Sequence, residues 1–175
     1  MKDAIFLQVQ RMVQKYGTRD PFELLSALNV EVRYSDVYEK DGLKGYCTLL
    51  NRVSYVVLNA KMGQCERRVV AGHELGHIML HGDYLKMGAM RDMDIYAATG
   101  KTEREANLCS ADTLISDQDA LEAIQDSDSD FFNAARTLYI PAPFFAFKLY
   151  SMVERGYAMQ VPMELSNAFL RGKRR

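Results

Sequence analysis

The amino-acid sequence predicts an α+β fold, in which a small, mostly antiparallel sheet of about three strands packs against helices. Apolar residues recur at helical spacing through most of the chain, whereas three short runs between residues 30 and 58 are rich in β-branched and aromatic side chains. A chain of 175 residues can bury roughly 70% of its unfolded surface, which is enough for a substantial core. We expect one main domain over residues 1–125 and a C-terminal helical region over residues 126–175, packed on it or appended to it.

Two helices are predicted before the sheet. Residues 3–16 place apolar side chains at helical spacing, and Gly17 follows where that helix would end. The second, shorter helix starts at Asp20 and Pro21, because aspartate is a favourable N-cap and proline is well tolerated at the first helical position.

The three strands are predicted after these helices, where the sequence changes its period. Residues 30–34 alternate between apolar and polar side chains, and residues 46–50 and 53–58 consist mainly of β-forming residues. Only two residues separate the second run from the third, a connection that suits a β-hairpin.

The second half of the sequence is predicted to be mostly helical. We expect a helix over residues 64–81, then a segment without a clear period over residues 82–100, which we interpret as a loop that could border a cleft. A helix over residues 101–115 follows. Further helices are expected over residues 116–123, with Ser116 as its cap, and over residues 126–138 and 141–157, with a proline-defined turn between the last two.

Composition argues against several classes of function. The net charge is −1 with 26% charged residues, and no predicted helix has an arginine-rich face, so direct nucleic-acid binding is not expected. The three cysteines are scattered without a C-x-x-C pair, which predicts reduced thiols rather than a disulfide framework or a thiolate zinc site. No stretch approaches 18 apolar residues, and the N-terminus lacks the apolar region of a signal peptide. We therefore expect a cytoplasmic protein without a membrane span.

The most informative motif is H-E-x-x-H, formed by His73, Glu74 and His77. On a helix, residues four apart lie on one face about one turn apart, so both imidazoles can reach a single Zn²⁺ at ~2.0–2.1 Å. Glu74 follows His73 by about 100° of rotation, which places its carboxylate beside the metal in the position of a general base. The alternative is an amphipathic helix with two buried, hydrogen-bonded histidines, and the rest of the sequence must decide between the two.

A catalytic zinc usually has three protein ligands and an open position, so a third ligand must come from another segment. His81 lies ~12 Å along a continuous helix from His73, too far for both to bind one ion. Glu103 and Glu105 are better candidates, but they differ by about 200° in direction on a helix, so only one can face the metal. We favour Glu103, because small and polar residues share its face and Asn107, one turn later, could hydrogen-bond a ligand. The alternative is that both glutamates only complement the helix dipole.

These segments together resemble the ImmA/IrrE family of zinc metallopeptidases. The resemblance runs from about residue 28 to 155 and rests on H-E-L-G-H at residues 73–77 and E-x-E-A-N at residues 103–107, in the family's order and spacing. The chain departs from the family pattern at residues 109–111 and over residues 131–150, and no function is carried over to the latter segment.

The resemblance implies a zincin-like helical core with a site of the gluzincin type. In it, His73, His77 and Glu103 would bind Zn²⁺, and Glu74 would be the catalytic base. Many family members are encoded on phages or mobile elements beside a helix-turn-helix repressor that they cleave. The resemblance therefore implies a protein substrate, namely a transcriptional repressor.

Three hypotheses about function follow from the sequence. The first, which we favour, is a zinc-dependent endopeptidase acting on a regulatory protein. The second is a non-enzymatic regulator in which zinc only stabilises a fold that binds protein or DNA, and the third is a toxin-like effector hydrolase. An extended substrate could lie along the edge of the small sheet. The donor for the developing oxyanion is not identified, and the candidates are His81, Tyr46, Tyr84 and Tyr96.

Overall fold

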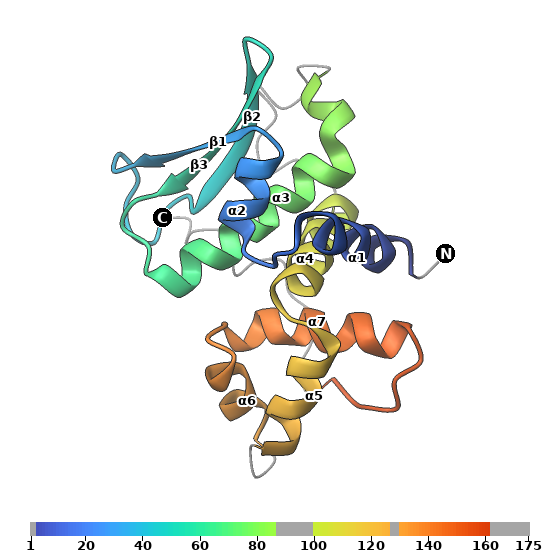
Figure 1. The fold of residues 1–175 in the computed structure, drawn as a ribbon. Coiled ribbons are helices and arrows are strands. Elements are labelled where there is room, and N and C mark those ends of the chain that lie inside the picture. The colour runs from blue at the N-terminus through green and yellow to red at the C-terminus, as the bar shows by residue number, and fades with distance from the viewer. Residues whose placement is uncertain (1–2, 87–99, 127–129, 162–175) are drawn as a thin grey trace.

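The computed structural model describes residues 3–86, 100–126 and 130–161, and within these ranges it has the predicted α+β fold (Figure 1). The helices are α1 (Ala4–Tyr16), α2 (Pro21–Ala27), α3 (Gln64–Lys86), α4 (Gly100–Leu114), α5 (Asp117–Asp126), α6 (Phe131–Thr137) and α7 (Ala142–Glu154), and the strands are β1 (Val30–Ser35), β2 (Gly45–Leu50) and β3 (Val53–Asn59). Helix α3 packs against the sheet on one side and against α4 on the other, while α5, α6 and α7 form a helical layer beyond α4 (Figure 1).

The ends of the first two helices follow the capping residues that the sequence predicts. Gly17 adopts the left-handed conformation (φ 70°) after α1, and its N–H donates to the carbonyl of Val13. The Asp20 side chain accepts hydrogen bonds from the N–H groups of Phe22 and Glu23 at the start of α2. Both helix boundaries are therefore fixed by local sequence.

The three strands form a mixed sheet in the order β1-β3-β2. Strands β2 and β3 make the expected antiparallel hairpin, and Asn51 and Arg52 at its turn both have positive φ, as a tight two-residue turn of this hand requires. Strand β1 pairs with β3 in parallel, with Val32 opposite Val56, so the expectation of a mostly antiparallel sheet was wrong for this pair. The chain between β1 and β2 carries β2 to the far side of β3, which leaves β1 and β2 as the two edges.

Several helix boundaries differ from those predicted, among them the ends of α5, at Asp126 instead of residue 123, and of α7, at Glu154 instead of residue 157. Helix α3 continues to Lys86 with a non-helical residue at His81, so residues 82–86 are not a loop, and the rest of the predicted loop lies outside the described residues. Helix α6 begins only at Phe131, because the Asp130 side chain accepts a hydrogen bond from the N–H of Phe132 and acts as its N-cap. The aspartate at position 126 instead ends α5.

Apolar side chains gather in two clusters on opposite sides of the α3–α4 pair. One cluster joins α1, α2 and α3 to the sheet, and the other joins α4 to α5, α6 and α7. The neighbours Val69 and Val70 in α3 belong to different clusters, so this helix has apolar contacts on two faces. The division into domains at residue 125 stays a prediction. None of the helices in the described ranges has both the length and the apolar character needed to cross a bilayer.

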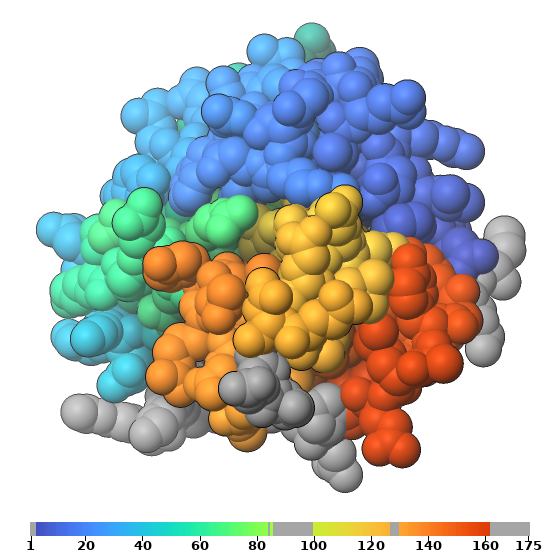
Figure 2. All heavy atoms as spheres, turned by 60° about the horizontal axis from the view of Figure 1, so that its bottom comes forward, coloured from blue at the N-terminus to red at the C-terminus, as the bar shows by residue number. Residues whose placement is uncertain are grey.

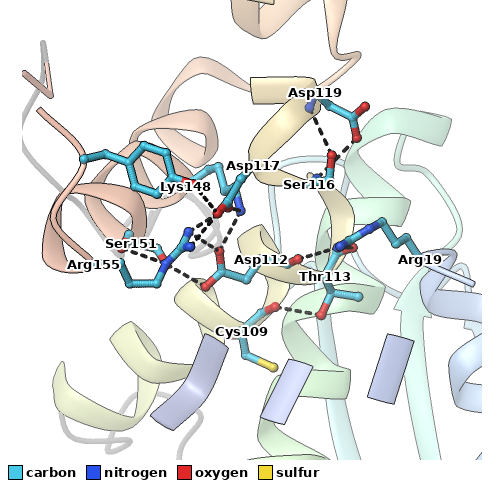
Figure 3. A network of polar contacts seen from close by, with 11 residues as sticks. Arg19, Cys109, Asp112, Thr113, Ser116, Asp117, Asp119, Lys148, Ser151 and Arg155 are labelled. Carbon is cyan, nitrogen blue, oxygen red and sulfur yellow. Dashed lines mark hydrogen bonds and ion pairs between the residues drawn. The ribbon is translucent and has the colours of Figure 1, made fainter. Parts of the chain in front are cut away.

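A buried polar network connects α4 to α5 and α7 (Figure 3). The ammonium of Lys148 in α7, which is fully buried, lies 2.9 Å from Asp112 of α4 and 2.6 Å from Asp117 of α5. The other oxygen of Asp112 accepts a hydrogen bond of 2.6 Å from the hydroxyl of Ser151. Both oxygens of this buried carboxylate are thus satisfied, as a charge removed from water requires.

The N-terminal segment is bound to the same region. The guanidinium of Arg19 donates to the carbonyls of Asp112 and Thr113 at 2.8 and 3.1 Å, and so satisfies acceptors that the end of α4 would otherwise leave open (Figure 3). The guanidinium of Arg155 lies 3.6 Å from the ring centroid of Phe6 in α1. Figure 2 shows the N-terminal residues (blue) bordering the yellow and gold residues of α4 and α5 and the red residues at the end of the described chain.

We predict that Lys148→Met lowers the free energy of unfolding by about 3 kcal/mol, because it removes the nearer countercharge of the buried Asp112 carboxylate and leaves only Arg155 at 3.9 Å. Urea denaturation near neutral pH measures this change. The matched control is Lys61→Met, whose ammonium is 3.9 Å from the exposed Glu39 and should contribute less than about 1 kcal/mol. Equal effects of the two substitutions would contradict the importance assigned to the buried network.

Candidate metal centre

Two glycines of α3 allow α4 to approach it closely. A Cβ atom at Gly76 would lie 2.8 Å from the carbonyl oxygen of Ala106, and one at Gly72 would lie 2.5 Å from the hydroxyl of Ser110. Glycine at both positions, one helical turn apart, removes the side chains that would separate the helices. The backbone of α4 can therefore lie directly beside the histidine face of α3.

This approach brings His73, His77 and Glu103 together. The Nε2 atoms of the two histidines are 3.0 Å apart, and the two Glu103 carboxylate oxygens lie 3.4 Å from His73 Nε2 and 3.3 Å from His77 Nε2. All three side chains are buried. Within the described ranges they form the one group of three histidine, cysteine or acidic side chains with the spacing to hold a metal ion.

The spacing of these three side chains fits tetrahedral zinc. Ligand bonds of ~2.0–2.1 Å at tetrahedral angles place ligand atoms roughly 3.3–3.4 Å from one another. The two nitrogens are 3.0 Å apart, and each lies 3.3–3.4 Å from a different oxygen of the Glu103 carboxylate, which are distances close to that value. Two imidazole nitrogens and one carboxylate are also the donor set of hydrolytic zinc sites that keep a fourth position open. The residues present therefore fit a zinc ion.

Asn107 orients one of the two histidines. Its Oδ1 lies 2.9 Å from His73 Nδ1, so this nitrogen donates the hydrogen bond and Nε2 is the ring nitrogen that faces the cluster. The sequence predicted such a contact from Asn107, because it lies one turn after Glu103 on the same face of α4. The side chain of Asn107 is fully buried.

The two glutamates that the sequence left as alternatives point to different partners. Glu103 faces His73 and His77, whereas Glu105 Oε2 lies 3.0 Å from Nε2 of His81. Burial alone would raise the pKa of the Glu103 carboxyl, but hydrogen bonds to the two histidines and their charges outweigh it and hold the pKa well below its ordinary value. Glu103 therefore remains an ionised acceptor inside the cluster.

Glu74 lies beside this cluster and also contacts the sheet. Its carboxyl is hydrogen-bonded by the side chain and the backbone of Cys47 in β2. Burial raises the pKa of Glu74 to about 7, against the opposing effects of His77 and Cys47. The contact with Cys47 was not anticipated, because only the fold brings β2 to the start of the H-E-x-x-H segment. Alternation along β2, which points Cys47 to the buried face, was the one available signal.

The candidates for an oxyanion donor are placed as follows. The ring nitrogens of His81 contact His77 and Glu105, so both are engaged outside the cluster. Tyr46 precedes Cys47 and points to the opposite face of β2, where burial and Tyr38 raise its pKa. The side chain of Tyr84 and the whole of Tyr96 lie outside the described residues.

Comparison with known proteins places the fold and the candidate centre within a known family model and shows similarity to a phage protein. The family model for the IrrE N-terminal-like domain of peptidase family M78 matches residues 25–150, a range that includes every residue of the candidate centre. The chain is also similar to "Uncharacterized immunity region protein 2" of Bacillus phage phi105, with 33% identity over 109 residues. The matched part covers 62% of this chain and 66% of the phage protein, slightly less than two thirds of its length.

We predict that Gly76→Ala destabilises the protein by about 1–3 kcal/mol and weakens zinc binding, because the added methyl group pushes the backbone of α4 away from α3. Urea denaturation and competition with a zinc chelator measure the two effects. Gly82→Ala is the matched control within the same helix, since a Cβ there meets no atom within 4 Å and alanine favours a helix by up to ~1 kcal/mol. If both variants behave alike, close packing at Gly76 does not determine the geometry of the centre.

We predict that Glu74→Gln makes the metal-free protein more stable than wild type at pH 8 but not at pH 4. The pKa of Glu74 is about 7 in the folded protein and near its ordinary value of 4.5 in the unfolded chain, so wild type loses stability as the pH rises through this window. The slope is on the order of 1 kcal/mol per pH unit. Denaturation of both proteins in the presence of a chelator, from pH 4 to 8, measures it, and a difference that does not change with pH would contradict the raised pKa.

Proposed function

This chain belongs to the peptidase family of IrrE N-terminal-like domains, and we propose that it is a zinc-dependent endopeptidase that cleaves a regulatory protein. The observation that carries the proposal is the buried group of His73, His77 and Glu103, whose ligand atoms lie within 4.8 Å of one another, with the Glu74 carboxyl beside it. In this proposal the three clustered residues hold the metal, and Glu74 is the catalytic base.

Each residue has a distinct part in the proposed reaction. When bound, zinc supplies a Lewis acid for the scissile carbonyl and lowers the pKa of water toward ~7. Glu74 accepts the proton of the attacking water and delivers it to the leaving amine nitrogen. A carboxyl with a pKa of about 7 before metal binding is suited to this exchange, because it can both accept and return a proton near neutral pH. Beside a bound divalent cation, the ionised form of Glu74 is favoured further.

The substrate is proposed to bind along strand β2. This strand is an edge of the sheet, and in the described part of the chain it pairs with β3 alone. Cys47 lies in the middle of β2 and contacts Glu74, so the edge passes next to the proposed base. An extended peptide that adds to this edge would place its backbone carbonyls near the metal site.

The proposed substrate is a helix-turn-helix repressor of a phage or mobile element. This part rests on the family, on the resemblance described from the sequence and on the similarity to a protein named for a phage immunity region. A repressor acts on DNA in the cytoplasm, and the proposed site of action is therefore cytoplasmic. Cleavage requires contact with the repressor only, which agrees with a net charge of −1.

We predict that Glu74→Gln keeps bound zinc but abolishes cleavage of a repressor encoded beside this protein. The substitution leaves all three proposed ligands in place and removes the group that carries the proton, a loss worth at least ~10²-fold in rate. Co-expression of the repressor with wild type or mutant, followed by mass spectrometry of the repressor and metal analysis of the purified protein, measures both properties. Lys61→Met, with its exposed ion pair, serves as the active control.

A different outcome would identify a different kind of protein. If Glu74→Gln still inactivates the repressor without cutting it, the chain is a binding protein in which zinc has a structural role. If wild type leaves the repressor intact and binds no zinc, both the substrate and the metal site proposed above are wrong.

A further inference from the structure

We propose that His81 and Glu105 form a positioning pair that fixes the ring of His77 for metal binding. The inference rests on the proposed metal site, but it concerns two residues outside the ligand set. His81 lies one helical turn after His77, and its side chain is buried. Glu105 lies on α4, two residues after Glu103, with its side chain 31% exposed.

Each hydrogen bond of the pair is donated in the direction from the metal site to the carboxylate. An ionised carboxylate only accepts hydrogen bonds, so at 3.0 Å the Nε2–H of His81 donates to Glu105 Oε2. A neutral His81 then has a lone pair on Nδ1, which lies 3.4 Å from Nδ1 of His77. This lone pair accepts the Nδ1–H of His77 and leaves the Nε2 lone pair of His77 directed at His73 and Glu103.

The two histidines of the centre are therefore supported in different ways. His73 is held directly by the amide oxygen of Asn107 at 2.9 Å. His77 is held through a second imidazole, and the carboxylate that fixes that imidazole comes from α4. Hydrogen-bond partners of this kind set the tautomer and the ring orientation of metal-binding histidines.

The position of His81 in the helix agrees with this role. Helix α3 departs from helical geometry at His81 alone among its described residues, with φ −125° and ψ 17°. The bend thus falls at the residue whose ring contacts both His77 in the preceding turn and Glu105 in the neighbouring helix. A glutamate that only complemented the helix dipole would not need a buried partner in another helix.

The test compares zinc affinity in Glu105→Ala, Glu105→Gln and Lys101→Ala by competition with a chromophoric chelator. Glu105→Ala should weaken zinc binding about 10–100-fold, because His81 loses the acceptor that fixes its tautomer. Glu105→Gln keeps an amide oxygen that accepts from His81 and should restore most of the affinity. Lys101 lies 3.8 Å from the other Glu105 oxygen and is exposed, so Lys101→Ala should change the affinity by less than about twofold.

Nitrogen-15 NMR of the histidine rings gives a readout that does not depend on activity. The chain has only three histidines, and the inference requires that in zinc-loaded wild type His81 is protonated at Nε2 and not at Nδ1, at a pH of about 8 where ordinary imidazoles are neutral. Protonation of His81 at Nδ1, or full zinc affinity in Glu105→Ala, would overturn the inference and leave the proposed function standing. A wild type without measurable zinc affinity would instead overturn the proposed function, and the positioning role with it.

Discussion

The close approach of α3 and α4 is the constraint on which the candidate centre depends. Glycine at positions 72 and 76 lets the backbone around Ala106 lie against α3, at a distance that any side chain there would prevent. The same approach brings Glu103, Asn107 and Glu105 of α4 opposite the three histidines of α3. One pair of helices thus supplies both the cluster itself and the groups that hold its rings. Ordinary side chains keep the axes of packed helices roughly 8–10 Å apart, and a wider separation of α3 and α4 would prevent these hydrogen bonds from forming.

Helix α4 carries several buried polar groups, and hydrogen-bond donors from other segments satisfy the acceptors near its C-terminal end. Arg19 donates to the carbonyls at its C-terminal end, and Lys148 and Ser151 bind both oxygens of Asp112. A buried ion pair contributes little net stability compared with apolar packing, but it requires one defined arrangement of the helices that supply it. For α4, that arrangement fixes the helix against α7 on the side opposite to α3, so the position of Glu103 is determined by contacts on both faces.

The sequence predicts the parts of this structure that depend on local chemistry. Aspartate at position 20 and glycine at position 17 set helix ends through their own caps, and the four-residue spacing of His73 and His77 places both on one face of any helix. Glu103 could be favoured over Glu105 because the faces of a helix follow from its period.

Contacts between segments that are distant in the sequence could not be predicted from local chemistry. The parallel pairing of β1 with β3, and the hydrogen bonds from Cys47 to Glu74, depend on how the chain crosses the sheet. Gly82 directly follows the bend at His81, but from the sequence alone we predicted the end of the helix there and not a bend within it.

The directions of the hydrogen bonds agree with a centre that binds a cation. Asn107 fixes the Nδ1–H of His73, and the proposed pair of His81 and Glu105 fixes the Nδ1–H of His77, so both Nε2 lone pairs face inward at a separation of 3.0 Å. The Glu103 carboxylate adds a third acceptor within 3.4 Å. Three electron-pair donors that converge in a buried site repel one another, and a cation between them removes this repulsion. In the metal-free protein, contacts with the two histidines outweigh burial and lower the pKa of the Glu103 carboxyl. A divalent cation at the centre would bind all three groups at close to tetrahedral spacing and still leave a position open.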